Sequence, residues 1–295
     1  MKILLFGATG FIGRVIRKNL SVGHEVIAAV RSDTPGDDEV FVDLLDQKSI
    51  QVALNQLKPD VIVNSAGIVD PNADTMLNVE FTKNIFEAAL ISEAPVRKVI
   101  ISGSAGEYGR ILSKEELPVS EETPLRADSG YGLAKKLEEE TALKYHEKGF
   151  PGVVVARIFN PIGVGMADKF LVSRIRKQIY EFVDGKRTSL EISRKDSTRD
   201  YIAVDDIASA IRVLVEGNAS HTVYNIGSGT AMSNGDLLQL MVSSSKIEHE
   251  PEVVETSDQP EPLVASRADI TRIQNEFHWT PKYTIADIVE EIMND

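Results

Sequence analysis

A tyrosine and a lysine four residues apart are the side chains of this sequence best suited to move a proton. They fall at the start of a helical pattern, in Tyr131-Gly132-Leu133-Ala134-Lys135. Residues four apart lie one turn above each other on a helix, so the lysine ammonium would stand beside the tyrosine phenol. A neighbouring cation favours the phenolate, which suits Tyr131 to act as a general acid or base near neutral pH. Because this spacing is common, its meaning depends on what the fold brings beside it.

A serine is expected at the edge of the sheet where such a pair could work. The aliphatic run Lys98–Ser102 is typical of a strand, and Gly103-Ser104-Ala105-Gly106 follows it directly. Ligands of open parallel sheets bind at the carboxyl ends of the strands. We therefore expect Ser104 at the ligand-binding edge.

A glycine-rich loop near the start of the chain is typical of dinucleotide binding. Gly7-Ala8-Thr9-Gly10-Phe11-Ile12-Gly13 follows a strand pattern and opens a helical one, which is the context that such a loop needs. The glycines allow a tight turn and a close approach of backbone to a pyrophosphate, whose charge lies at the helix N-terminus. The spacing is GxxGxxG rather than GxGxxG. We expect this loop to bind a dinucleotide; the alternative is a tight turn alone.

The residues at the end of the second predicted strand, Glu25–Val30, indicate which dinucleotide would bind. Selectivity for the unphosphorylated form commonly comes from an Asp or Glu at this position. Here the strand ends in Ala28-Ala29-Val30-Arg31-Ser32, so the carboxylate is missing and an arginine stands beside its place. Since an arginine can bind a 2′-phosphate, Arg31 favours NADP(H) over NAD(H). In the alternative interpretation, Arg31 is a solvated loop charge.

A parallel sheet is needed to bring these residues together, and the first half of the sequence predicts one. Short aliphatic runs, too continuous to be half-exposed strands, alternate with amphipathic helical stretches. The predicted strands are Ile3–Phe6, Glu25–Val30, Val61–Asn64, Lys98–Ser102 and Gly152–Arg157, and the predicted helices cover about 11–22, 47–57, 78–93 and 131–148. This alternation indicates an α/β fold with a doubly wound parallel sheet of the Rossmann type.

After Gly165 the rhythm changes, which indicates a smaller C-terminal domain. The expected elements are a helix over Asp168–Gly185, a strand over Ser189–Ile192, a helix over Val204–Glu216, a strand over Tyr224–Ile226, a helix capped by Ser233 with Asp236, mostly loop over Lys246–Pro262, and a last helix from about Ile285. The dinucleotide-binding domain would then comprise residues 1–165 plus about 195–227. The substrate domain would comprise about 166–194 plus 228–295.

Composition narrows the class of protein. The length of 295 residues suits two domains or one large one and buries a sizeable core. With 32 basic and 45 acidic side chains, the formal net charge is −13, which argues against nucleic-acid and anionic-membrane partners. Cysteine is absent, which excludes disulfides and Cys-ligated zinc and fits a reducing, cytoplasmic location. No metal site is predicted, and no segment approaches the length of a membrane span.

Taken together, the motifs resemble the extended short-chain dehydrogenases/reductases, the NAD-dependent epimerase/dehydratase family, that act on nucleotide sugars. The resemblance covers essentially the whole chain and depends on the order and spacing of the motifs. They are Gly7–Gly13, Ser104, Tyr131 with Lys135, Arg157-Ile158-Phe159-Asn160-Pro161, the run 199–206, Tyr224-Asn225-Ile226-Gly227-Ser228-Gly229 and Trp279-Thr280-Pro281. The resemblance implies an NAD(P)-dependent enzyme whose substrate is a nucleotide-diphosphate sugar.

The resemblance also implies a role for each site residue. Tyr131 would donate or remove the proton at a sugar hydroxyl or carbonyl, Lys135 would hold the nicotinamide ribose and tune Tyr131, and Ser104 would hydrogen-bond the reacting oxygen. Cofactor contacts would be Gly7, Thr9, Gly10, Phe11, Ile12, Gly13, Arg31, Asp43 (at the adenine), Leu44, Ser65, Ala66, Gly67, Tyr131, Lys135 and Phe159. Substrate contacts would be Ser104, Asn160, Arg174 and Arg199. For Arg199, the alternative is a surface ion pair with Asp200 or Asp205.

Two reactions of this family are excluded because this chain lacks the residues that they need. The 4,6-dehydratases need a carboxyl group directly after the serine, where this chain has Ala105 and Gly106. Glu107 is displaced by one position and is interpreted as a structural or rim carboxylate. The epimerase–reductases that make GDP-fucose use a cysteine and a histidine, and this chain has no cysteine and no histidine at the matching position. Reduction of a 4-keto sugar and 4-epimerisation through a transient keto sugar remain.

The run 101–109 with Phe159–Gly163 is most similar to the GDP-6-deoxy-D-mannose reductase group. We therefore expect NADPH-dependent reduction of a nucleotide-linked 4-keto-6-deoxy-hexose. One alternative is a UDP- or dTDP-sugar 4-epimerase with retained NAD, and another is a non-catalytic protein that binds NADP(H). Relatives often carry an Arg-Pro that meets the substrate diphosphate, where this chain has Gln259-Pro260. Either Arg267 or Arg174 replaces that arginine, or the substrate class has changed.

A homodimer is also expected. Relatives pair through the two helices that correspond to about 78–93 and 131–148. Apolar residues recur in the first of these at spacings of three and four, at Leu77, Phe81, Ile85, Ala88 and Ala89. In the alternative interpretation, this stripe covers the sheet.

Overall fold

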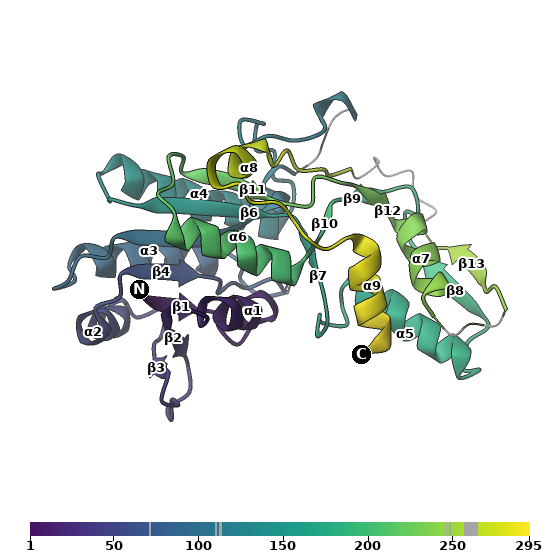
Figure 1. Cartoon of the computed structure of the whole chain (residues 1–295), viewed down its shortest axis with the longest axis horizontal. Helices are drawn as coiled ribbons and strands as arrows, with labels where there is room; N and C mark the ends of the chain where they lie inside the picture. The colour runs from purple at the N-terminus through teal and green to yellow at the C-terminus, as the bar shows by residue number, and fades with distance from the viewer. Residues whose placement is uncertain (71, 110, 112–113, 246, 248, 257–264) are drawn as a thin grey trace.

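The computed structural model of the chain describes residues 1–70, 72–109, 111, 114–245, 247, 249–256 and 265–295. A wide sheet with helices on both faces forms one end of the long axis, and a smaller group of helices and short strands forms the other (Figure 1). Each helix in the described part of the chain is too short or too polar to cross a membrane.

The main sheet contains seven parallel strands within the described residues, in the order β11-β6-β5-β4-β1-β2-β3. They are β1 (Lys2–Phe6), β2 (Glu25–Val30), β3 (Glu39–Phe41), β4 (Val61–Asn64), β5 (Lys98–Ser104), β6 (Val153–Ile158) and β11 (Val223–Ile226). The chain runs outward from β1 to β3, returns to β4 on the other side of β1, and runs outward again to β11. This order confirms the predicted doubly wound sheet, and it places the topological switch point between β1 and β4.

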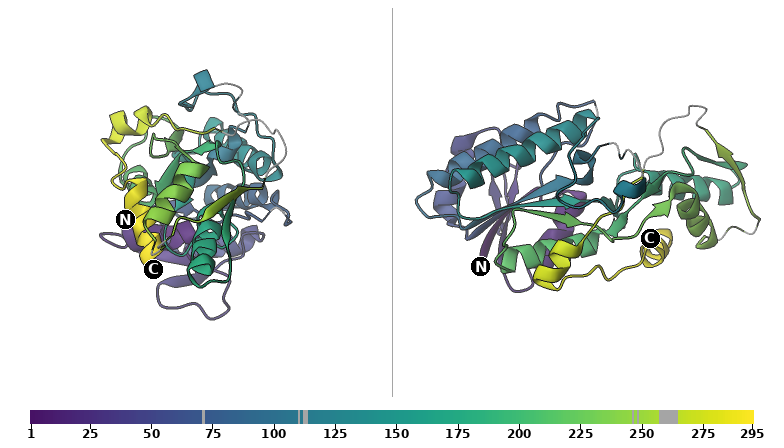
Figure 2. Two further views of the ribbon diagram at one scale, coloured as in Figure 1. Left: turned by 90° about the vertical axis from the view of Figure 1, so that its right-hand side faces the viewer. Right: turned by 90° about the horizontal axis from the view of Figure 1, so that it is seen from above.

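Helices cover both faces of this sheet (Figure 2). On one face lie α1 (Phe11–Leu20) and α6 (Val204–Glu216), and on the other lie α2 (Gln47–Leu57), α3 (Leu77–Leu90) and α4 (Gly130–Glu147). Alternate residues of β1 serve the two cores, with Ile3 and Leu5 in one and Leu4 and Phe6 in the other. A strand buried on both faces needs apolar side chains at every position, which explains the continuous aliphatic runs.

A third core organises the smaller unit. It is formed by α5 (Leu171–Val183), α7 (Asn234–Ser243), α9 (Ile285–Asn294) and β8 (Ser189–Ile192), and β8 pairs with β13 (Glu252–Glu255). Two short strand pairs lead into it from the main sheet. They are β7 (Asn160–Ile162) with β10 (Tyr201–Ala203), and β9 (Thr198–Arg199) with β12 (Met232–Ser233).

One predicted helix start in the second half of the chain is wrong, and one segment predicted as mostly loop also contains a short strand. The helix predicted over Asp168–Gly185 begins at Leu171, because Phe170 has an extended backbone and acts as its N-cap. The segment Lys246–Pro262, predicted as mostly loop, contains strand β13, which adds to the edge of β8. Residues 246, 248 and 257–262 of that segment lie outside the described part of the chain. The predicted N-cap of α7 is confirmed, since Ser233 Oγ accepts the backbone N–H of Asp236 at 2.9 Å.

One segment of residues 228–295, which were expected to belong to the smaller domain, packs on the main sheet instead. Helix α8 (Thr271–Phe277) packs against β11, and its Ile273 is buried in the core of the main sheet together with Trp279. The indole N–H of Trp279 donates to Ser209 Oγ on α6 at 2.8 Å. Asp206, also on α6, accepts two backbone N–H groups from the segment that follows the tryptophan. The Trp-Thr-Pro motif therefore fixes the path from the main sheet to α9.

The apolar stripe of α3 mainly serves the core of the monomer. Ile85, Ala88 and Ala89 are buried against the sheet, and Leu77 and Phe81 are half-buried. Three of the five stripe residues therefore cover the sheet, as in the alternative interpretation of this stripe. A contact with a second copy of the chain through α3 and α4 would use the outer surfaces of these two helices.

Candidate active site

The glycine loop has no room for side chains at two of its glycines. Gly7 has a φ of +76°, and a Cβ atom added to it would lie 2.4 Å from the backbone nitrogen of Ala66. A Cβ atom added to Gly13 would lie 1.9 Å from the carbonyl oxygen of Gly7. These contacts explain the glycines physically: the loop turns tightly between β1 and α1 and packs on the backbone of Ser65 and Ala66 at the end of β4.

The first turn of α1 offers a place for an anion. Its N-cap is Gly10, and no side chain within the described residues caps it. Thr9 and Gly10 are exposed, and Phe11 and Ile12 are half-buried. The free N–H groups and the positive end of the helix dipole therefore lie at the carboxyl edge of the sheet, where the glycine loop packs on Ser65 and Ala66. This cradle of backbone donors fits the pyrophosphate of a dinucleotide.

Two residues expected to meet the adenosine half lie at the ends of neighbouring strands. Arg31 directly follows β2, is exposed, and has no ion-pair partner within the described residues. Asp43 follows β3 and is half-buried, and its Oδ1 accepts the backbone N–H of Leu45 at 2.9 Å. The carbonyl oxygen of Leu44 is held by Asn84 Nδ2 at 2.9 Å. The second carboxylate oxygen of Asp43 and the whole guanidinium of Arg31 remain available to a ligand.

Ser104 lies at the carboxyl end of β5, as predicted. Its Oγ accepts the backbone N–H of Gly106 at 3.1 Å, and its own N–H donates to Glu107 Oε1 at 2.6 Å. These bonds cap the short 3₁₀ helix η1 (Ala105–Glu107) that follows the strand. The serine is half-buried, so its hydroxyl stays accessible.

Tyr131 and Ser104 are brought together around Gly106. A Cβ atom added to Gly106 would lie 3.3 Å from Ser104 Oγ and 3.8 Å from Tyr131 Cδ1. Gly132 packs so closely that a Cβ there would lie 2.5 Å from the carbonyl oxygen of Gly106. Ser129 caps α4 by accepting the N–H of Gly132 at 2.9 Å, which fixes the start of the helix. Because Gly106 and Gly132 have no side chains, η1 and α4 can approach each other closely.

Lys135 is buried one turn into α4. Its side chain is 4% exposed, and its Nζ donates to Glu138 Oε2 at 2.5 Å. Burial alone lowers the pKa of Lys135, but the charge of Glu138 and the nearby phenol of Tyr131 outweigh it and hold that pKa above its ordinary value. The lysine therefore stays protonated inside the protein.

A second buried ion pair lies behind the catalytic candidates. Arg157 on β6 donates to both carboxylate oxygens of Glu139, at 2.8 Å and 2.5 Å. It also donates to the hydroxyl of Tyr108 at 2.9 Å, and Tyr108 in turn donates to Asn225 Oδ1 at 2.6 Å. Burial raises the pKa of Tyr108 to about 12, so this tyrosine keeps its proton. The arginine of the Arg-x-Phe-Asn motif is thus structural.

Glu107 is a structural carboxyl group rather than a residue of the rim. Its side chain is fully buried, and Oε2 has no hydrogen-bond partner within the described residues and lies 3.7 Å from Arg157 Nε. Burial, and then the charge of Glu139, raise the pKa of Glu107 well above its ordinary value. Because Glu107 is fully buried, its carboxyl group is not exposed beside the half-buried Ser104.

Asn160 and Arg199, the predicted diphosphate contacts, lie at the junction with the smaller unit. Asn160 Nδ2 donates to the carbonyl oxygen of Asp200 at 2.9 Å, next to Arg199. The carboxylate of Asp200 is buried and accepts from Ser228 N and Oγ, Gly229 N and Ala268 N. Arg199 is half-buried and has no ion-pair partner within the described residues. The alternative of an ion pair with Asp200 or Asp205 is therefore wrong within the described residues.

The remaining residues that were predicted to contact the substrate or the cofactor differ in how exposed their side chains are. Arg174 is exposed in the first turns of α5, and the backbone carbonyl of the half-buried Arg267 accepts the N–H of Val119. Gln259-Pro260 lies outside the described residues. Phe159 is 1% exposed and packs in the core beside Tyr108, so its side chain is part of the scaffold and only its backbone can face a cofactor.

The residues that sequence reasoning missed are Glu138, Glu139 and Thr82, all fully or nearly fully buried. Glu138-Glu139-Glu140 is typical of a solvated helix face. For Glu138 and Glu139 the sequence shows only that they lie three and four residues after Lys135, on its side of the helix, and this spacing does not show that they are buried.

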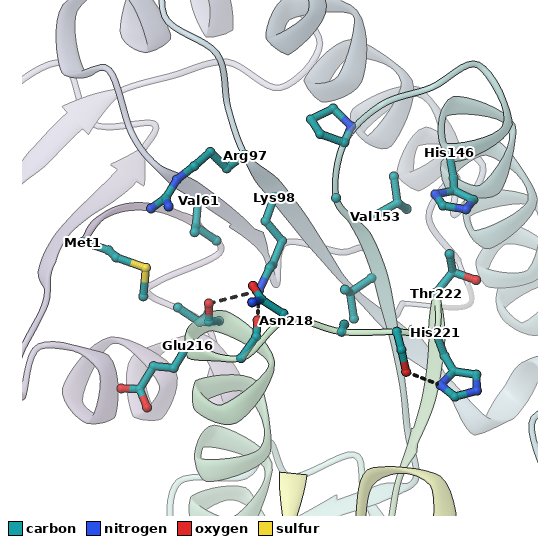
Figure 3. A pocket seen from close by; sticks show the side chains of 17 residues that line it. Met1, Val61, Arg97, Lys98, His146, Val153, Glu216, Asn218, His221 and Thr222 are labelled. Carbon is teal, nitrogen blue, oxygen red and sulfur yellow. Dashed lines mark hydrogen bonds between the residues drawn. The ribbon is translucent and has the colours of Figure 1, made fainter. Parts of the chain in front are cut away.

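A cavity of 430 Å³ lies at the opposite edge of the sheet, lined by Met1, Val61, Lys98 and Val153 among others (Figure 3). There Lys98 Nζ donates to the carbonyl oxygens of Leu214, Val215 and Gly217 and so caps the end of α6. Lys98 begins β5 and Ser104 ends it, about 20 Å apart. The cavity is separate from the candidate active site.

Comparison with known proteins gives consistent matches along the chain. The model of the NAD dependent epimerase/dehydratase family matches residues 3–227. GDP-6-deoxy-D-mannose reductase of Pseudomonas aeruginosa is 27% identical over 307 residues, which cover 100% of this chain and 96% of that protein. A dTDP-6-deoxy-L-talose 4-dehydrogenase (NAD(P)(+)) of Kitasatospora kifunensis is 26% identical over 303 residues, 99% of this chain and 94% of that protein. The structure of RMD from Pseudomonas aeruginosa complexed with NADPH superimposes with a TM-score of 0.84 at 25% identity, covering 99% and 97% of the two chains.

Proposed function

The chain belongs to the NAD dependent epimerase/dehydratase family, and from this premise we propose that it reduces the 4-keto group of a nucleotide-linked 6-deoxy-hexose with NADPH. The observation that carries the proposal is the arrangement around Gly106: Ser104 and Tyr131 flank one accessible point at the carboxyl edge of the sheet, and the charged Lys135 lies one turn behind. The carboxyl group that dehydration would need is missing from this point.

The residues of the chain divide the reaction between them. Bound NADPH supplies the hydride to C4 of the sugar. Tyr131 gives its phenolic proton to the O4 oxygen as negative charge develops there, and Ser104 Oγ hydrogen-bonds the same oxygen. Lys135 stabilises the phenolate that results. In the reverse direction Tyr131 takes the proton from a 4-hydroxyl group, which is the reaction that the name of the talose 4-dehydrogenase describes.

The choice of NADPH is supported by two observations. Arg31 is exposed and unpaired within the described residues at the end of β2, where it can bind a 2′-phosphate. The structure of RMD is described with NADPH, and the talose 4-dehydrogenase with NAD(P)(+). NAD(H) is the alternative cofactor.

The substrate is a nucleoside diphosphate sugar held between the two units. Residues 1–165 and about 195–227 bind the dinucleotide. The smaller unit covers the nucleotide sugar and comprises residues 166–194 and 228 onward, apart from α8 and Trp279, which pack on the main sheet. A diphosphate needs local cations in a chain of formal net charge −13, and Arg199, half-buried at the junction, meets that need. Asn160, Arg174 and Ser104 complete the predicted contacts. The enzyme acts as a homodimer that pairs through the outer surfaces of α3 and α4.

The test is a turnover assay with purified protein, NADPH and GDP- or dTDP-linked 4-keto-6-deoxy-hexoses. We expect stoichiometric loss of NADPH absorbance with formation of the 4-hydroxy sugar, and no loss with Tyr131→Phe. Interconversion of 4-epimers without net loss of NADPH would support the 4-epimerase instead. Binding of NADPH without turnover of any sugar would support a non-catalytic role.

A further inference from the structure

Glu138 forms a buried ion pair with Lys135 for which neither the proposed reaction nor the motifs account. The side chains of Lys135 and Glu138 are 4% and 2% exposed, and Nζ and Oε2 are 2.5 Å apart. An ammonium has three N–H donors, so this bond leaves two for other partners. A carboxylate at this place acts directly on the direction and charge of the lysine.

The other oxygen of Glu138 is also fixed. Thr82 on α3 is fully buried, and its Oγ1 donates to Glu138 Oε1 at 2.9 Å. The carboxylate is therefore held from two helices, by Lys135 within α4 and by Thr82 from α3. Because both oxygens are bonded, Glu138 cannot turn away without leaving a buried polar group unpaired.

Each of the two buried cations near the site has its own carboxylate partner within the described residues. The cations are Lys135 and Arg157, and Glu139 is bonded to Arg157 through both of its oxygens. Glu107, on η1, has a pKa raised well above its ordinary value by its burial and then by the charge of Glu139. Glu139 is thus taken by Arg157, and the carboxylate hydrogen-bonded to Lys135 is that of Glu138.

We propose that Glu138 is a positioning residue that keeps Lys135 charged and directed toward the cofactor site, with Thr82 holding Glu138 in turn. The proposal rests on the proposed function of Lys135 as the residue that holds the nicotinamide ribose. Lys135 faces Glu138 and Tyr131 on its own helix, Glu107 on η1, and Thr82 of α3 behind Glu138. Without Glu138, the largest of the effects that oppose burial is lost, so the pKa of Lys135 falls and the lysine loses its proton at lower pH.

The experiment measures the dissociation constant of NADPH by its fluorescence between pH 6.5 and pH 9.5, without sugar. The proteins are the wild type, Glu138→Gln, and Glu140→Gln as a matched control on the same helix, since the Glu140 side chain is 41% exposed. We expect Glu138→Gln to bind NADPH about tenfold more weakly than the wild type at pH 9.5, the effect of losing one charge-assisted hydrogen bond, and nearly as well at pH 6.5. Glu140→Gln should follow the wild type at every pH.

Two results would overturn the proposal. Affinities of Glu138→Gln that match the wild type throughout would show that Lys135 does not depend on Glu138. Weakening by one constant factor at every pH, together with a lower melting temperature, would show a structural role only. Thr82→Val gives a second measurement with little change in side-chain volume. If this variant also binds NADPH more weakly at high pH, but by a smaller factor than Glu138→Gln, the result supports the role of Thr82 in holding Glu138. If NADPH binding behaves as expected but no 4-keto sugar is reduced, the proposed reaction fails while the positioning role stands.

Discussion

Replacing Glu107 by glutamine tests whether the buried carboxyl group of Glu107 is protonated in the folded protein. In the structure Oε1 of Glu107 accepts the N–H of Ser104, and Oε2 lies 3.7 Å from Arg157 Nε without a hydrogen bond within the described residues. Burial and the charge of Glu139 raise the pKa of Glu107 well above 4.5. Glutamine keeps the acceptor oxygen for Ser104 and replaces the protonated oxygen by an amide of similar size. It therefore imitates the carboxyl group that the folded protein contains.

The size of the effect follows from proton linkage. Above pH 4.5 the unfolded chain releases the proton of Glu107, whereas the folded protein keeps it until its raised pKa is reached. Over that window the contribution of Glu107 to the free energy of unfolding falls by about 1.4 kcal/mol per pH unit. Glutamine does not titrate, so the free energy of unfolding of the variant should rise relative to the wild type by up to about 1.4 kcal/mol for each pH unit above 4.5, until the raised pKa of Glu107 is reached.

The assay is urea unfolding of both proteins at pH 5, 6, 7 and 8, with Glu140→Gln as the exposed control. We expect the difference in the free energy of unfolding between Glu107→Gln and the wild type to grow with pH, and that of the control to stay constant. A constant difference for Glu107→Gln from pH 5 to pH 8 would refute the reasoning, because it would mean that Glu107 ionises alike in the folded and unfolded states.

Substitutions at three further residues test the candidate active site. Tyr131→Phe should leave NADPH affinity nearly intact and lower kcat by orders of magnitude, because only the proton transfer is lost; undiminished turnover would remove Tyr131 from its role. Arg31→Asp should shift the ratio of NADPH to NADH affinities toward NADH, measured by fluorescence titration, and an unchanged ratio would show that Arg31 points into solvent. Arg199→Ala should raise the substrate KM about ten- to a hundredfold and spare NADPH affinity, with Arg199→Lys recovering only part; the opposite pattern would contradict the diphosphate assignment.

Much of the fold could be predicted from the sequence because its signals are local. Continuous aliphatic runs mark strands buried on both faces, and β2 and β4 have the predicted bounds. Gly7 and Gly13 are glycines because neighbouring backbone leaves no space for a side chain, so the loop can be recognised without knowing the rest of the fold. Short elements such as β13 were missed, since a strand of four exposed residues exists only through its pairing with β8.

The sequence by itself therefore determined the order of elements, the glycine cradle, and the residue types available for proton transfer. Which charges are buried was decided by the tertiary structure alone. Three consecutive glutamates on a helix look solvated, because carboxylates are rarely buried unless they are paired. Glu138 and Glu139 are buried because Thr82 and Arg157, distant in the chain, reach them from α3 and β6. Their partners are set by how the helices pack on the sheet, and no local pattern in the sequence specifies that packing.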